Sequence, residues 1–190
     1  MRFTAADLRA LQARGLKITQ QTGKKQHAES YVGRGMGLQQ LVNQANEQYK
    51  QLGIASIWEF GAEAKWIPGG KLIPREGTVD FIGLWQGRGL AFDCKETAED
   101  ALPAANVKTQ QVEFLMDFSR AGGIAFILVA YTGPGRFFVV PIEKYFPIWA
   151  GRRGLKIEEA ERIGREVRSS RRVCLDYLKG VERWHENLAT

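Results

Sequence analysis

The sequence has few of the residues that build zinc sites and disulfide frameworks. Its 190 residues include two cysteines, Cys94 and Cys174, and two histidines, His27 and His185. These residues are far apart in sequence, and none has the C-x-x-C or H-x-x-x-H spacing that is typical of a metal-binding or redox segment. We therefore expect neither a zinc site nor a disulfide-stabilised fold.

Long apolar runs, internal repeats and low-complexity tracts are also absent. No stretch approaches the roughly 20 apolar residues that a membrane-spanning helix requires. The N-terminal segment MRFTAADLRALQARG lacks the apolar centre of a secretory signal. Hydrophobic residues make up 44% of the chain and charged residues 25%, a balance typical of globular proteins. These features predict a soluble, cytoplasmic protein.

The charge of the chain is predominantly basic. It contains 27 lysines and arginines against 21 aspartates and glutamates, which gives a formal net charge of +6. The calculated isoelectric point is about 9.4. A basic balance of this kind favours a polyanionic partner such as nucleic acid over a small acidic substrate.

The pattern of apolar residues predicts one domain over residues 33–190, preceded by an N-terminal helix and basic arm over residues 1–32. The helix of the arm is expected over residues 4–14. In the domain, helical periodicity predicts helices over 36–52, 107–120, 142–150, 157–168 and 174–187. Strands are predicted over 56–60, 63–68, 79–85, 89–96, 124–131 and 136–141. Two prolines and a Gly-Gly pair predict a protruding hairpin over about 66–76. This order indicates an α/β fold, a mixed central β-sheet flanked by helices.

Two of the predicted strands each contain a carboxylate where an apolar residue is expected. The segment is TVDFIGLWQGRGLAFDCKET, residues 78–97. Because side chains alternate between the faces of a strand, Asp93 shares a face with Lys95, and an antiparallel hairpin brings Asp80 close to Asp93. Two half-buried carboxylates repel each other unless a cation lies between them. Oxygen ligands without histidine or cysteine side chains select Mg²⁺, with Mn²⁺ as a substitute.

Lys95 has a chemical role beside such a cation, because its ammonium group can hold a water molecule or stabilise charge on phosphate oxygens. The alternative is a surface salt bridge at the solvated ends of the strands. The helix over 107–120 adds Gln111, which falls on its apolar stripe with Val107, Phe114, Leu115 and Phe118. A glutamine at this position serves either the site or a backbone group of the core.

These segments resemble the PD-(D/E)xK nuclease superfamily and, more closely, the RecU-type Holliday junction resolvases. The likeness runs from about Gly33 to Trp184 and includes GRGMGLQQLVNQANEQY, the segment 78–97, TQQVEFLMDFSRAGGIAFILV, FFVVPIEKYFPIW and RVCLDYLKGVERW. The resemblance implies a restriction-endonuclease-like fold with a short protruding stalk, which the hairpin over 66–76 would form. It also implies a homodimer that cuts two strands of a four-way DNA junction symmetrically.

The resemblance assigns roles by position. It implies that Asp80 and Asp93 are metal ligands, that the main-chain carbonyl of Cys94 completes the metal shell, that Lys95 orients or activates water, and that Gln111 supports the site. Two positions depart from the family pattern. Gln39 stands where the opening helix usually supplies a glutamate, and Glu59 or Glu63 is a candidate replacement. Asp93 stands where a glutamate is common.

We expect DNA binding to be mainly electrostatic and independent of sequence, because lysine and arginine contacts to phosphate carry no base information. The candidate residues are Lys24, Lys25, Arg34, Lys65, Lys71, Arg75, Arg152, Arg153, Arg168, Arg171 and Arg172. The sequence thus predicts a Mg²⁺-dependent endodeoxyribonuclease that resolves four-way junctions with paired nicks. The alternatives are another nuclease of the superfamily, of flap-cutting or restriction type, and a non-catalytic junction-binding or recombinase-modulating module.

Overall fold

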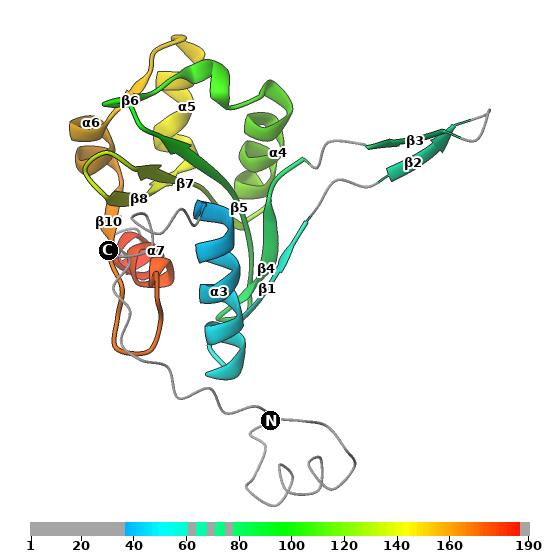
Figure 1. Cartoon of the computed structure of the whole chain (residues 1–190), viewed down its shortest axis with the longest axis vertical. Coiled ribbons are helices and arrows are strands. Elements are labelled where there is room, and N and C mark those ends of the chain that lie inside the picture. Colours follow the sequence, from blue (N-terminus) through cyan, green and yellow to red (C-terminus); the bar gives the residue numbers. More distant parts are fainter. Residues whose placement is uncertain (1–36, 61–63, 68–70, 75–77, 187–190) are drawn as a thin grey trace, which may run out of the picture.

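Figure 1 shows the computed structural model of the chain, which describes the backbone of residues 37–60, 64–67, 71–74 and 78–186. Side chains are described at residues 37–60 and 78–182. The predicted helix over residues 4–14 and the basic arm lie outside the described residues. None of the helices within the described ranges is long and apolar enough to cross a membrane.

A six-stranded mixed sheet forms the centre of the molecule, which confirms the predicted fold class. The order of its strands is β1-β4-β5-β7-β8-β10. β5 and β7 pair in parallel, and every other neighbouring pair is antiparallel. The strands are β1 (Ala55–Glu59), β4 (Phe81–Trp85), β5 (Arg88–Thr97), β7 (Ile124–Tyr131), β8 (Arg136–Pro141) and β10 (Arg165–Val167).

Helices cover both faces of this sheet (Figure 1). One face packs against α3 (Leu38–Gln51) and α7 (Tyr177–Glu186), and the other against α4 (Thr109–Arg120), α5 (Ile142–Ala150) and α6 (Ile157–Ile163). A short 3₁₀ helix at Ala104–Asn106 precedes α4, and the two-residue strands β6 (Ala101–Leu102) and β9 (Leu155–Lys156) pair with each other. Two separate apolar cores result, and all eight residues of β7 are buried, as its continuous apolar sequence predicted.

The register of the β4–β5 hairpin brings the two carboxylates opposite each other. Trp85 pairs with Arg88, so the turn contains only Gln86 and Gly87, which both have positive φ angles, 50° and 76°. Turns with positive φ at both central residues match the natural twist of a hairpin. The last register pair at the other end is Phe81 with Phe92. One step further, Asp80 lies opposite Asp93.

A second, smaller sheet consists of β2 (Ala64–Ile67) and β3 (Lys71–Pro74), which pair antiparallel. These two strands form the predicted hairpin, and they project from the body of the molecule near the ends of β1 and β4 (Figure 1). The predicted tip at Gly69 and Gly70 lies outside the described residues.

One predicted helix was wrong in its second half. The segment 157–168 was expected to be a single helix, but α6 ends at Ile163 and the chain continues as the edge strand β10. Gly164 separates the two elements, and a Cβ atom at this position would lie 2.6 Å from the carbonyl oxygen of Val139 in β8. Only glycine allows the backbone to pass this close to β8, so the helix stops and the following residues join the sheet.

Gly83 in β4 holds β1 close to the sheet, and its replacement tests this contact. A Cβ atom at Gly83 would lie 2.5 Å from the carbonyl oxygen of Ser56, a backbone atom of β1, whereas one at Gly89 would meet the end of the Phe118 ring at 3.0 Å. We expect Gly83→Ala to lower the free energy of unfolding by about 1–3 kcal/mol in urea denaturation. Gly89→Ala is the matched control with the smaller loss, since a ring can move. Equal losses would contradict the close approach of β1.

Candidate active site

Strand β5 divides its side chains between the two faces of the sheet. Phe92 and Cys94 pack in the core beneath α3 and α7, while Asp93 and Lys95 point to the α4 face. Asp80 precedes β4 at the position opposite Asp93. The structure therefore brings together Asp80, Asp93 and Lys95, which were predicted from alternation alone.

Asp93 is a fully buried carboxylate with 0% exposure. Its Oδ1 accepts a hydrogen bond of 2.8 Å from Nε2 of Gln111. Nζ of Lys95 lies 2.5 Å from its Oδ2, and the Lys95 side chain is 17% exposed. This contact is a charge-assisted ion pair, and Lys95 is the one partner of Oδ2 among the described residues.

The surroundings of Asp93 disfavour its charge. The pKa of the carboxyl is raised from 3.8 to about 6 in total. Burial is the largest cause, the charge of Asp80 also raises the pKa, and the adjacent Lys95 ammonium lowers it. Asp80 also lies close enough to accept a hydrogen bond from the protonated form of Asp93. One lysine therefore does not compensate for two converging carboxylates in a dehydrated position.

Asp80 contacts the strand that carries its partner. Its Oδ2 accepts a hydrogen bond of 2.7 Å from the backbone N–H of Cys94. The N–H and C=O groups of one strand residue point to the same side of the strand. The carbonyl oxygen of Cys94 therefore also points toward Asp80, at the level where the β4–β5 pairing has ended. The Cys94 thiol lies on the opposite face, and burial raises its pKa well above the ordinary value.

Gln111 is held in place by hydrogen bonds from both ends of its amide. It is the third residue of α4 and is 8% exposed. Its Nε2 donates to Asp93, and its Oε1 accepts a hydrogen bond of 3.0 Å from the backbone N–H of Lys108 at the helix start. The sequence left two partners open for this glutamine, the Asp93–Lys95 cluster and a backbone group of the core. The structure shows a contact with each. The amide connects the start of α4 to the buried carboxylate.

The donor atoms at this position fit a hard divalent cation. Two carboxylates face each other, one of them has a buried oxygen whose one partner among the described residues is the Lys95 ammonium, and a main-chain carbonyl points to the same side. All three donors are oxygens, which Mg²⁺ and Mn²⁺ prefer. Within the described ranges, no third carboxylate, histidine or cysteine side chain joins Asp80 and Asp93 in a cluster. The protein would supply three oxygens and leave the remaining positions to water and phosphate.

The first helix is connected to the strands by two other glutamates. Glu59 accepts hydrogen bonds from Nε2 of Gln39 at 2.8 Å and from Nδ2 of Asn43 at 2.9 Å. Both oxygens of Glu59 are thus engaged on the α3 face, opposite the face that carries Asp93. Glu63 lies outside the described residues.

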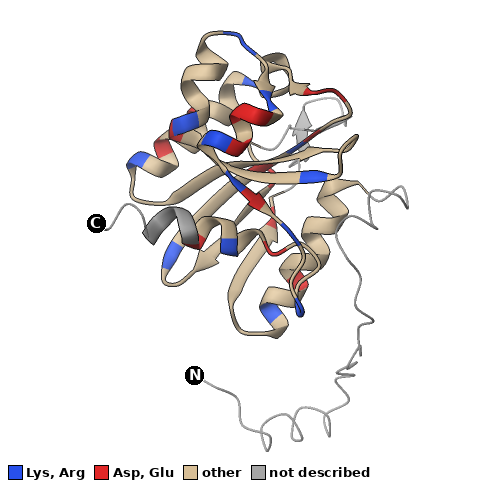
Figure 2. Cartoon of the chain, turned by 90° about the vertical axis from the view of Figure 1, so that its left-hand side faces the viewer, with Lys and Arg blue, Asp and Glu red and all other residues tan. Residues whose placement is uncertain are grey.

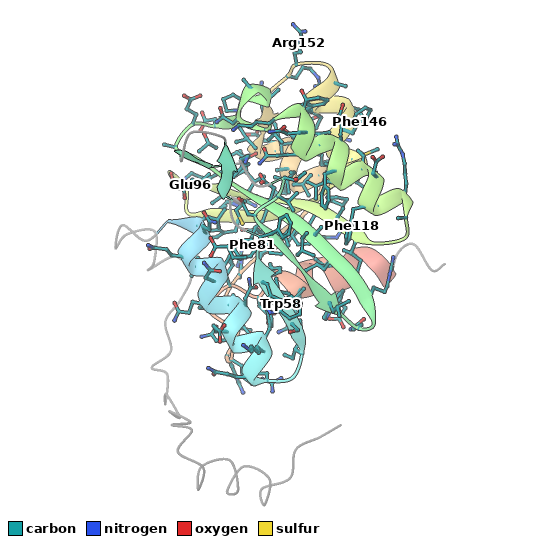
Figure 3. All side chains as sticks on the ribbon, turned by 90° about the vertical axis from the view of Figure 1, so that its right-hand side faces the viewer. Trp58, Phe81, Glu96, Phe118, Phe146 and Arg152 are labelled. Carbon is teal, nitrogen blue, oxygen red and sulfur yellow. The ribbon has the colours of Figure 1, made fainter. Side chains whose placement is uncertain are left out.

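Glu96 holds the start of α3, a contact that no sequence pattern indicates. Its Oε2 accepts a hydrogen bond of 3.0 Å from the backbone N–H of Leu38, the first residue of the helix. Figure 3 shows Glu96 beside this helix end. A carboxylate at a helix N-terminus is favoured by the helix dipole. The residue after Lys95 therefore fixes α3 relative to strand β5.

Comparison with known proteins identifies the family of this chain. The family model for recombination protein U, RecU, matches residues 33–183. The chain belongs to the RecU family. It is 27% identical over 168 residues to the Holliday junction resolvase RecU of Ligilactobacillus salivarius, which covers 80% of this chain and 79% of the relative. It is also 27% identical over 195 residues to that of Leuconostoc citreum, which covers 95% and 94%.

A solved structure with partial similarity is that of Hjc from Archaeoglobus fulgidus, a Holliday junction resolvase. The match covers 54% of this chain and 78% of that chain, at 17% sequence identity and a TM-score of 0.33.

The basic residues predicted to bind DNA separate into groups in this RecU-family chain. Arg152, which has a positive φ angle of 53°, lines a groove of about 1050 Å³ with Lys108, Thr109 and Trp149. Lys108 and Thr109 belong to the start of α4, so the groove begins next to Gln111. Arg153, in contrast, lies 3.7 Å from the carboxylate of Glu159. Figure 3 shows Arg152 at the far end of the molecule from α3.

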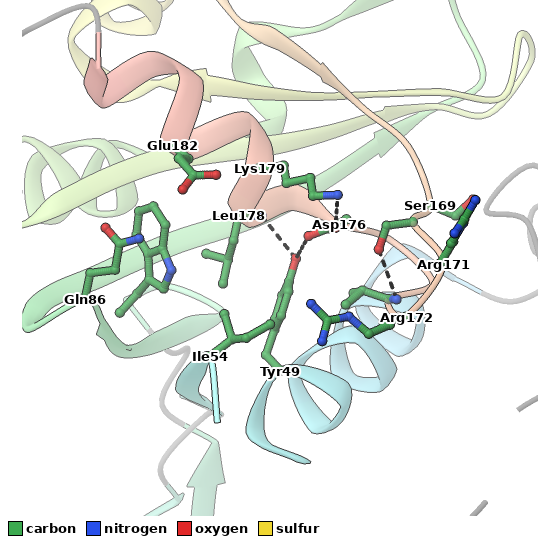
Figure 4. Close-up of a pocket in the computed structure, with 13 residues that line it drawn as sticks. Tyr49, Ile54, Gln86, Ser169, Arg171, Arg172, Asp176, Leu178, Lys179 and Glu182 are labelled. Atoms are coloured by element: carbon green, nitrogen blue, oxygen red, sulfur yellow. Dashed lines mark hydrogen bonds and ion pairs between the residues drawn. The ribbon is translucent and has the colours of Figure 1, made fainter. Parts of the chain in front are cut away.

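Arg171 and Arg172 lie on the other side of the sheet. They line a cavity of about 770 Å³ between the end of α3 and the start of α7, with Tyr49 and Asp176 in its wall (Figure 4). Neither arginine forms an ion pair with another described residue, whereas Arg168 lies 3.4 Å from Glu166. Figure 2 shows that lysines and arginines alternate with acidic residues over this side of the molecule.

The remaining predicted DNA-binding residues fall where their side chains are not described. Lys24, Lys25, Arg34 and Arg75 lie outside the described residues, and Lys65 and Lys71 belong to β2 and β3, whose backbone alone is described. Their roles stay predictions.

The raised pKa of Asp93 predicts how stability depends on pH in the metal-free protein. Between pH 3.8 and about 6, the folded state binds a proton that the unfolded state has released, so the contribution of Asp93 to stability decreases as the pH rises through this window. The decrease is at most about 3 kcal/mol. We expect Asp93→Asn to match the parent protein at low pH and to be more stable above about pH 7.

The difference in stability between Asp93→Asn and the parent is measured by urea denaturation in the presence of EDTA. The measurement is made at both ends of this pH window. Asp117→Asn is the control, because that aspartate is exposed and pairs only with Arg120. A difference for Asp93→Asn that does not change with pH would contradict the buried, disfavoured charge.

Proposed function

We propose that this chain is a structure-selective endodeoxyribonuclease that resolves four-way Holliday junctions by metal-dependent phosphodiester hydrolysis. The observation that carries the proposal is the opposed pair Asp80 and Asp93 with Lys95 on one strand face. The family membership and the names of the curated relatives give the substrate. The buried Asp93 carboxylate supports a cation at this position, since the single Lys95 ammonium faces two converging carboxylates.

The proposed cofactor is Mg²⁺, with Mn²⁺ as a substitute, held by Asp80, Asp93 and the carbonyl of Cys94. Such an ion would polarise the scissile phosphate and lower the pKa of a bound water. Lys95 lies between the buried carboxylate and solvent, because its side chain is partly exposed while its ammonium reaches Asp93. We assign to Lys95 the stabilisation of charge on the phosphate oxygens and the orientation of the attacking water. Gln111 holds the plane of the Asp93 carboxylate.

The DNA backbone is proposed to follow the groove that begins at α4. The N-terminus of this helix adjoins Gln111, and a helix N-terminus with a nearby arginine attracts phosphate groups. Arg152 then contacts a phosphate beyond the scissile one. The residues 1–32 are proposed as a separate basic arm, and residues 33–190 as the nuclease domain, acting in the cytoplasm.

Paired symmetric nicks require two copies of the site, and an apolar patch offers a surface for a homodimer. Trp58 is 56% exposed, Leu84 54% and Phe60 43%. The register places Trp58 opposite Ile82 on the outer strands β1 and β4, and the backbone N–H of Phe60 donates to the carbonyl of Asp80. The three side chains share the face that carries Asp80, and Figure 3 shows Trp58 at the outer strands. Patches of exposed large apolar residues mark interaction surfaces. We propose that a second copy of the chain covers this one.

The metal ligands are tested by Asp80→Asn and Asp93→Asn. Each removes one charge that a cation requires, so we expect cleavage of a labelled four-way junction with Mg²⁺ to fall by at least about 100-fold. Junction binding in gel shifts should remain, because the lost charge is negative and repels DNA. Asp117→Asn, far from the site, should cleave as the parent does. Retained cleavage by either site variant would reject the assignment.

The substrate class is tested with the parent protein on three labelled DNAs, a mobile four-way junction, a flap and a linear duplex. Paired symmetric nicks confined to the junction support the proposal. Preferential cutting of the flap or duplex would indicate another nuclease activity of the superfamily. Tight junction binding without cleavage under Mg²⁺ or Mn²⁺ would indicate the non-catalytic module.

The proposed dimer surface is tested by Trp58→Glu. A charge in the apolar patch should shift the protein toward monomer in sedimentation or light-scattering measurements, and should replace paired nicks by single ones. Phe146→Glu is the matched control, because Phe146 is 38% exposed on α5 and lies apart from the patch. An unchanged oligomeric state for Trp58→Glu, or an equal effect of both variants, would contradict this surface.

A further inference from the structure

Two buried polar atoms of the core beneath α4 and α5 have unused hydrogen-bonding capacity among the described residues. One is Oδ2 of Asp93, whose one partner there is the Lys95 ammonium at 2.5 Å, and the other is the hydroxyl of Tyr145 in α5, which has none. The third such atom among the described residues, Nδ2 of Asn46, belongs to α3 on the other side of the sheet. Tyr145 is 0% exposed, so bulk water does not reach its hydroxyl.

The sheet places Tyr145 next to Asp93. Asp93 of β5 is in register with Ile127 of β7, which is in register with Val140 of β8. These three side chains therefore form a row on one face. Tyr145 belongs to the apolar cluster that covers Ile127 and Val140, and its helix packs on β7, β8 and α4. Burial and the charge of Asp93 both raise the pKa of Tyr145, which agrees with this adjacency.

Comparable polar atoms in this layer all have partners. The hydroxyl of Tyr131 donates to the carbonyl of Leu155 at 2.7 Å, and Nε1 of Trp149 donates to the carbonyl of Val107 at 2.9 Å. A buried hydroxyl without a partner destabilises a fold relative to an apolar replacement, because its hydrogen bonds to water are lost without replacement. Phenylalanine would fill the same space without that loss. The hydroxyl of Tyr145 thus lacks an acceptor, and the nearby Oδ2 of Asp93, which contacts Lys95, can accept a second hydrogen bond.

We propose that Tyr145 is a positioning residue for Asp93. Its hydroxyl donates a hydrogen bond to Oδ2, either after a small side-chain movement or through one buried water. Together with Gln111 on Oδ1, this bond fixes the carboxylate from both oxygens. The hydrogen bond between Tyr145 and Asp93 does not require that the protein be a nuclease. The effect of this bond on cation binding rests on the proposed function.

Tyr145→Phe removes only the hydroxyl, and Tyr131→Phe is the matched control on the same face. With EDTA, both variants should lose stability in urea denaturation, because each loses a buried hydrogen bond. Without DNA, the dissociation constant of Mn²⁺ should increase about tenfold for Tyr145→Phe, as for other groups that orient a metal ligand. It should be unchanged for Tyr131→Phe, since that hydroxyl bonds to a backbone carbonyl away from the site.

Two results would overturn the proposal. One is a Tyr145→Phe protein that is as stable as the parent or more stable, which would mean that the hydroxyl has no partner. The other is a loss of stability with unchanged Mn²⁺ affinity, which would make the role structural only. If the parent binds no Mn²⁺, the proposed function fails, and carboxyl ¹³C titration of metal-free protein then decides the link. Tyr145→Phe raises the pKa of Asp93 only if the hydroxyl donates to it.

Discussion

The opposition of two carboxylates across the β4–β5 hairpin is the constraint on which the site depends. It follows from register, because a pairing in which Phe81 faces Phe92 leaves Asp80 and Asp93 facing each other one step further. A slip by one residue would turn every side chain of β5 to the other face. The two-residue turn at Gln86 and Gly87 prevents such a slip. The turn at the far end of the hairpin thus determines that Asp80 and Asp93 lie opposite each other.

This opposition makes the site electrostatically unfavourable in the absence of a cation. Exposed ion pairs contribute about 0–1 kcal/mol, so the many arginine–glutamate pairs of the surface do little for stability. Asp93 differs because it is fully buried, and its pKa of about 6 shows that Lys95 does not offset the combined effect of burial and of Asp80. The fold tolerates this because the surrounding sheet and α4 bury large apolar surfaces. The same imbalance gives the position its preference for a proton or a metal ion.

Much of this arrangement could be predicted from the sequence, since it follows from local periodicity. Alternation placed Asp93 and Lys95 on one face, and the apolar stripe of α4 placed Gln111 toward the sheet. The contacts that periodicity does not encode were missed. Glu96 and Leu38 meet over 58 residues of sequence, and the strand after Gly164 forms only because β8 offers an edge. Burial of Tyr145 was predictable from its helix, whereas its proximity to Asp93 depends on how α5 packs.

Strand β5 links the two halves of the molecule because consecutive residues serve different faces. Phe92, Cys94 and Glu96 connect it to α3 and α7, while Asp93 and Lys95 connect it to α4. A movement of α3 would therefore be transmitted through Glu96 to the adjacent Lys95 on the opposite face. The apolar patch lies along the same edge, since Phe60 is hydrogen bonded to the backbone of Asp80. A dimer formed through that patch would press on the residue that completes the site, so assembly and the geometry of the carboxylates would be physically coupled.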